Sequence, residues 1–187
     1  MEEEVVKVDG NVLLLLGEVA KGYEPIIFKE GKFMVKDPIY HSHPVVRVTA
    51  HGAVTYAEHY GKRLPTAAEW FFAMKRENDT KKTSSVLAEQ SSMSHIEMMQ
   101  GQAQTPSSEG QSLPERPVSV TQSQPNQYGI RGLDGNVNEW GIIEPIEPSR
   151  ASRGMRYGIF PDAVVRRPWE AFKDVGFRTV LPVSKQK

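Results

Sequence analysis

The sequence predicts an α+β fold, because strand patterns, helix patterns and a last strand pattern follow one another along its 187 residues. Four short runs of β-branched and large apolar residues fall within the first 36 positions. Two runs with apolar residues at helical spacing come next, over residues 50–60 and 67–76. A closing strand is predicted at residues 175–180. Strands and helices that are segregated in this way are typical of the α+β class.

The early strands are predicted at residues 5–8, 12–16, 25–28 and 32–35. Glu30-Gly31 stands between the last two strands and suits a two-residue hairpin turn, in which glycine takes a positive φ at little steric cost. Residues 45–49 follow Pro44 and are predicted to form one more extended segment.

The stretch from Gly61 to Trp70 predicts how the two helices are joined. Thr66 and Glu69 form a capping box, in which each side chain accepts a hydrogen bond from the backbone N–H of the other residue. Thr49 is the expected N-cap of the first helix, and Gly61 suits the left-handed position that ends it. The expected buried stripes are Ala53, Tyr56, Ala57 and Tyr60 on the first helix, and Trp70, Phe71, Ala73 and Met74 on the second.

Composition excludes several classes of protein. Lys plus Arg equals Asp plus Glu, at 23 each, so the net charge of zero gives no electrostatic basis for binding nucleic acid. The absence of cysteine rules out disulfides, thiolate nucleophiles and cysteine-bound metals. The longest apolar run, residues 12–16, is too short to span a membrane. The acidic start does not resemble a secretory signal, so we expect a cytoplasmic protein, or an exported one if a leader has been removed.

We expect a single domain over residues 1–187, with a polar insertion at about 78–124. Ser, Gln, Thr, Gly and Pro dominate this insertion. A loop of such length inside a domain is usually either functional or disordered, and the composition favours a mobile surface excursion.

Three groups of residues are candidates for function. The loop from Gly132 to Trp140 offers several oxygen ligands for a hard cation, but without EF-hand spacing, and a turn held by its own Asx side chains is the alternative. Arginines gather between residues 150 and 178, where they can clamp an anion or form internal ion pairs. His41 and His43 alternate, which favours a metal site weakly and packing or surface roles more strongly.

Four blocks of sequence stand in a fixed order between residues 44 and 180. They are Pro-Val-Val-Arg-Val-Thr at 44–49, the decapeptide at 61–70, the segment 126–140 that ends in Gly-Asn-Val-Asn-Glu-Trp, and Gly-Phe-Arg at 176–178. Together they resemble the sulfatase-modifying-factor family, which contains the formylglycine-generating enzymes and their relatives. The resemblance implies a C-type-lectin-like fold with two helices, small twisted antiparallel sheets and long irregular loops.

The resemblance also implies a structural calcium ion. Its ligands would be the carbonyls of Asp134, Gly135 and Val137 and the carboxylate of Glu139. The formylglycine-generating enzymes bind copper through a cysteine pair ahead of the last block, and this chain has no cysteine. We therefore expect no copper, and the chain resembles a non-catalytic member of the family, a pseudoenzyme.

The expected function is that of a binding domain that recognises a protein or a small ligand through its loop face. The predicted ligand-binding residues are Arg153, Arg156, Tyr157, Arg167 and Trp169. Two alternatives stay open: a metal-dependent enzyme of unknown chemistry that uses His, Asp and Glu, and a structural accessory domain of a larger assembly.

Overall fold

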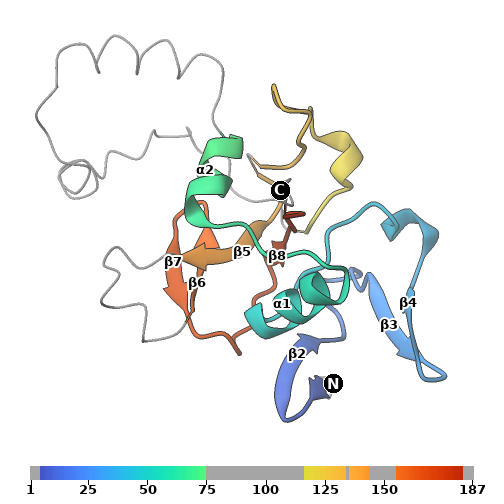
Figure 1. The fold of residues 1–187 in the computed structure, drawn as a ribbon. Helices are drawn as coiled ribbons and strands as arrows, with labels where there is room; N and C mark the ends of the chain where they lie inside the picture. Colours follow the sequence, from blue (N-terminus) through green and yellow to red (C-terminus); the bar gives the residue numbers. More distant parts are fainter. Residues whose placement is uncertain (1–4, 75–115, 134, 144–154, 183–187) are drawn as a thin grey trace, which may run out of the picture.

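The computed structural model describes residues 5–74, 116–133, 135–143 and 155–182, and its helices and small sheets agree with the predicted α+β class (Figure 1). Two antiparallel hairpins come first, then two helices, then a four-stranded sheet built from the second half of the chain. Most of the polar insertion predicted at 78–124 lies outside the described residues. Neither described helix is long and apolar enough to cross a membrane.

The two N-terminal hairpins are closed by tight turns. Strands β1 (Val5–Val8) and β2 (Asn11–Leu15) are joined by Asp9-Gly10, and strands β3 (Ile26–Lys29) and β4 (Lys32–Val35) by Glu30-Gly31. The φ angles of all four turn residues are positive, between 49° and 79°, as the twist-matched hairpin turns require. All four strands begin within one residue of the predicted positions. The β3–β4 hairpin projects from the side of the molecule opposite β6 and β7 (Figure 1).

Helix α1 (Ala50–His59) begins at the predicted N-cap. The Thr49 hydroxyl accepts from the Gly52 N–H at 3.0 Å and donates to the Val12 carbonyl at 2.7 Å, which ties the helix start to β2. A Cβ at Gly52 would lie 2.2 Å from the Leu13 carbonyl oxygen, so this side of the helix admits only small side chains. The predicted stripe was therefore too wide: the tyrosines are half-exposed, and the buried residues are Ala50, Gly52, Ala53 and Ala57.

Helix α2 (Ala67–Met74) begins with the predicted capping box. The Thr66 N–H donates to Glu69 Oε2 at 2.9 Å, and the Glu69 N–H donates to Thr66 Oγ1 at 3.3 Å. Trp70 is 2% exposed, whereas Phe71 and Phe72 are 41% and 62% exposed. The wide apolar face predicted for this helix was therefore wrong for Phe71, whose ring packs edge-on against Phe160 at 5.6 Å and stays partly exposed.

The four-stranded sheet has the order β7-β6-β5-β8. Strand β5 (Asn138–Ile143) pairs antiparallel with β6 (Arg156–Phe160) and parallel with β8 (Val175–Phe177), and β7 (Val164–Arg166) forms the other edge. Only β8 was predicted. Glycines interrupt the strand pattern of β5 and β6, and each is required by packing: a Cβ at Gly141 would meet Phe160 at 2.5 Å, and one at Gly158 would meet Ile143 at 2.5 Å.

The segment predicted as extended at residues 45–49 forms only an isolated bridge between Val48 and Leu14. Arg47 has a φ of 60°, and this left-handed residue breaks the strand geometry. Two short 3₁₀ turns, η1 (Pro38–Tyr40) and η2 (Val120–Gln122), complete the described elements.

Two apolar clusters form the core on either side of β5. One contains the fully buried Trp140, whose indole N–H donates to the Val48 carbonyl at 2.9 Å, and the other contains Trp70, Leu133 and Phe160. The segment 61–70 runs between them. Its Pro65 carbonyl accepts from the Ile142 N–H at 2.8 Å, and residues 63 and 180 exchange backbone hydrogen bonds of 3.0 and 2.8 Å. This segment therefore joins β5 to the closing stretch of the chain.

Candidate functional site

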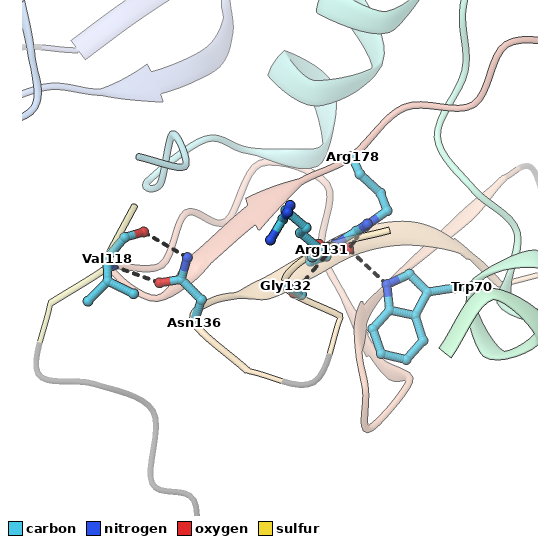
Figure 2. A network of polar contacts seen from close by, with 7 residues as sticks. Trp70, Val118, Arg131, Gly132, Asn136 and Arg178 are labelled. Carbon is cyan, nitrogen blue, oxygen red and sulfur yellow. Dashed lines mark hydrogen bonds and ion pairs between the residues drawn. The ribbon is translucent and has the colours of Figure 1, made fainter. Parts of the chain in front are cut away.

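The carboxylate of Glu139, on β5, lies at the centre of a buried polar network, and the residue is only 5% exposed. Arg178, directly after β8, donates from Nη2 to Oε1 and from Nε to Oε2, both at 2.5 Å. Trp70, on α2, donates its indole N–H to Glu139 Oε2 over 2.8 Å (Figure 2). Both carboxylate oxygens therefore accept hydrogen bonds, and the buried negative charge is compensated by a bidentate guanidinium.

The loop before β5 is held by two further sets of contacts. Arg178 Nη2 lies 3.4 Å from the carbonyl oxygen of Arg131 and 3.5 Å from that of Gly132. Asn136, at a φ of 73°, accepts from the Val118 N–H at 2.8 Å and donates to the Val118 carbonyl at 2.9 Å (Figure 2). The side-chain amide of Asn136 thus forms two hydrogen bonds with the backbone of Val118, like a neighbouring β-strand. These bonds tie the loop to residues 116–123.

These contacts bear on the calcium site that the resemblance implies. Asp134 lies outside the described residues, and the carbonyl of Gly135 accepts from the Val137 N–H at 3.1 Å. Calcium takes about six to eight oxygen ligands, and a guanidinium that faces both oxygens of Glu139 would repel such an ion. In this arrangement Glu139 does not fit a role as a calcium ligand. Within the described residues, no three His, Asp or Glu side chains gather in a way that could hold a metal.

Four of the five predicted ligand-binding residues are described, and they lie on β6 and on the turn after β7. The Arg167 guanidinium lies 5.8 Å from the ring centroid of Trp169, which is 56% exposed. Arg166 lies 5.9 Å from the ring centroid of Phe172. Arg156, Arg166 and Arg167 are exposed, and no ion pair joins them to any carboxylate in the described part of the chain.

Tyr157 lies partly inside the core. It is half-buried on β6 and packs against the apolar cluster that contains Trp140. Burial, and next the negative charge of Glu58, raise the pKa of its phenol. Arg153 lies outside the described residues. The structure therefore brings Arg167 and Trp169 together at the surface, places Arg156 on the neighbouring strand, and turns Tyr157 toward the core.

A protein-family comparison decides the relationship of this chain. The family model described as the sulfatase-modifying factor enzyme 1-like domain, FGE-sulfatase, matches residues 18–158, which is well over half of the sequence. The chain belongs to this family. The absence of cysteine from this FGE-sulfatase domain fits a non-catalytic member.

Two curated relatives of this FGE-sulfatase domain are chlamydial proteins. The protein titled serine/threonine-protein kinase pkn1 from Chlamydia pneumoniae is 34% identical over 107 residues, which are 57% of this chain and 15% of the relative. The protein of the same title from Chlamydia caviae is 53% identical over 45 residues, which are 24% of this chain and 7% of the relative. The matched part is therefore a small share of each relative.

Sequence reasoning missed two features of the FGE-sulfatase domain. It did not place Trp70 and Arg178 on Glu139, although all three residues stand in the family blocks. It also missed an apolar cavity of about 540 Å³ between the hairpins, α1 and β8. Its walls include Val6, Leu13, Phe33, Tyr56 and Phe177, and Arg178 borders it. Two family blocks contribute to its walls, the first through Val45 and Val48 and the last through Phe177 and Arg178, and they are the signals that pointed to this region.

Proposed function

We propose that this chain is a non-catalytic binding domain with a C-type-lectin-like fold, which recognises a partner through the surface around Arg167 and Trp169. The observation that carries the proposal is the exposed stack of these two side chains. Arginine and tryptophan are enriched among the residues that dominate binding energy at interfaces. The guanidinium over the ring reduces the mobility of both, so less conformational entropy is lost when a partner binds.

The scaffold supports this reading. The two separate hairpins, the two helices and the mixed sheet are compatible with the irregular α+β architecture that a C-type-lectin-like fold implies. We propose that residues 1–187 form one domain with an insertion at about 78–124. The protein would be cytoplasmic unless a leader directs its export. The chlamydial relatives that carry kinase titles are far longer than the matched segment, which also suits an accessory module within a larger protein.

Capture of a partner from a lysate of the native host tests this proposal. The double variant Arg167→Ala/Trp169→Ala should retain about a tenth or less of the wild-type capture, since each residue typically contributes more than about 1 kcal/mol at such positions. Lys7→Ala/Ile39→Ala is the matched control: it also removes one cation and one exposed apolar side chain, of which Ile39 is 66% exposed. Equal capture by the wild type and the Arg167/Trp169 variant would count against this surface.

Elemental analysis tests the main alternative, a metal-dependent enzyme. The protein would be purified without a chelator and without a histidine tag. Stoichiometric iron, copper or zinc would favour the enzyme over the binding domain. Stoichiometric calcium would support the structural ion that the family resemblance implies at residues 134–139, and it would require Arg178 to release Glu139.

A further inference from the structure

Strand β7 leaves one edge of the four-stranded sheet unpaired. In the described part of the chain it pairs only with β6, through the partners Tyr157–Arg166, Gly158–Val165 and Ile159–Val164. All three residues of β7 are exposed, and Val164 and Val165 are 38% and 41% exposed. An edge strand presents a row of backbone donors and acceptors to which an extended chain can add.

Three arginines surround this edge. Arg166 is the last residue of β7, Arg167 follows it, and Arg156 begins β6. Continuing the β6–β7 register by one residue sets Arg156 opposite Arg167. Like charges at such neighbouring positions repel each other, so an anion that binds between them relieves the repulsion.

Two carboxylates that follow these arginines in the sequence have other hydrogen-bond donors. Glu170 accepts from the backbone N–H of Arg167 at 2.8 Å, and Asp174 accepts from the Asn138 amide at 3.2 Å. Two of the guanidiniums lie over aromatic rings, Arg166 over Phe172 and Arg167 over Trp169. A guanidinium that stacks through its face keeps its in-plane N–H donors for a carboxylate. Arg166 and Arg167 are therefore held in place with donors available to an anionic ligand.

We infer that the β7 edge, together with Arg156, Arg166 and Arg167, docks an extended acidic segment of a partner protein. The segment would add as a strand along Val164–Arg166, its backbone would pair with β7, and its carboxylates would bind the arginines. This inference rests on the proposed function, because it names the kind of partner that the Arg167–Trp169 surface takes. The zero net charge of the chain favours a short acidic peptide over nucleic acid, whose binding relies on a broad positive field.

Fluorescence anisotropy with a defined probe tests the inference. The probe is a fluorescein-labelled peptide in which pairs of glutamates alternate with single valines. Its carboxylates lie on both faces of the added strand, as the consecutive Arg166 and Arg167 require. Matched peptides carry glutamine in place of glutamate, or N-methyl groups on alternate backbone nitrogens. Wild-type protein should bind the glutamate peptide about tenfold or more tightly than either matched peptide, because each loses one of the two kinds of contact.

Protein variants separate the site from net charge. Arg166→Ala/Arg167→Ala should weaken binding of the glutamate peptide by about tenfold or more. Lys7→Ala/Lys62→Ala removes the same charge from exposed positions outside β6 and β7, and should change binding by less than about twofold. Thermal melts of both variants must match the wild type, which shows that the fold is retained.

Several results would overturn the inference. They are equal binding of the glutamine peptide, equal binding of the N-methylated peptide, equal losses in the two protein variants, or tighter binding of single-stranded oligothymidylate than of the peptide at physiological salt. The partner-capture experiment stays independent of these results. If capture depends on Arg167 and Trp169 while the peptide fails, the binding function stands and only strand docking by an acidic segment is rejected.

Discussion

Glu139 shows how a single buried charge depends on its donors. Its carboxylate is shielded from water and accepts from Arg178 and Trp70. In a low-dielectric site, removing one partner of an ion pair leaves a charge whose desolvation is no longer offset. Arg178, the arginine of the last family block, therefore has a structural role in addition to its place beside the apolar cavity.

At Arg178 we expect a sign reversal in a double-mutant cycle. Arg178→Met should reduce the free energy of unfolding by about 3–5 kcal/mol, because it strands the Glu139 carboxylate. Glu139→Gln should destabilise the wild type but stabilise the Arg178→Met background, where it removes the uncompensated charge. Urea denaturation of the four proteins measures both effects. If Glu139→Gln lowers the free energy of unfolding in both backgrounds, the carboxylate does not stabilise the fold through its ion pair with Arg178.

At the scale of elements, helix α2 begins on a capping box that also carries an ion pair. Arg63 donates to both oxygens of Glu69, at 2.5 and 2.6 Å, and these bonds, ahead of the one from Thr66, lower the pKa of Glu69 from 4.5 to about 2. A carboxyl with a depressed pKa stabilises the fold above its unfolded pKa, and this stabilisation is lost as the pH falls through its folded pKa.

The lowered pKa of Glu69 predicts how the effect of Glu69→Gln on stability changes with pH. The wild type should be more stable than the variant above pH 4.5, and the difference should shrink as the pH falls toward about 2. Denaturation curves at several pH values measure the difference. A gap that stays constant across this range would contradict the role of the Glu69 charge.

The packing of α2 depends on one ring. Trp70 stacks on Phe160 with centroids 5.4 Å apart and an interplanar angle of 22°. Trp70→Ala should cost about 3–5 kcal/mol through the cavity it leaves. Phe72→Ala, on the exposed side of the same helix, removes a stack on Tyr128 and should cost about 0.5–1.5 kcal/mol. Thermal melts that rank the two variants equally would overturn the assignment of the buried face.

At the scale of the whole molecule, the loop 131–140 is a junction. It joins the segment 116–123 through Asn136, the end of β8 through Arg178, and the sheet through β5. Because a protein guanidinium already neutralises Glu139, this junction needs no metal ion to offset the carboxylate.

We therefore expect the unfolding midpoint to be independent of calcium. Melts in excess calcium and in excess chelator should coincide, since an ion that binds only the native state would raise the midpoint through mass action. Magnesium at the same concentration controls for ionic strength. A midpoint that rises with calcium but not with magnesium would restore the site predicted at Asp134, Gly135, Val137 and Glu139.

The sequence by itself determined the family, the four N-terminal strands and the starts of both helices. The hairpin turn at residues 30–31, the N-cap at Thr49 and the capping box at Thr66 and Glu69 were correctly predicted, because each involves residues only a few positions apart. The absence of cysteine likewise indicated a non-catalytic member of the family without any coordinates.

Only the tertiary structure decided what Glu139 contacts, since its partners lie 69 and 39 positions away. Tertiary packing also decided which helix residues are buried, because the close contact of Gly52 with Leu13 leaves room for alanines and excludes the tyrosines.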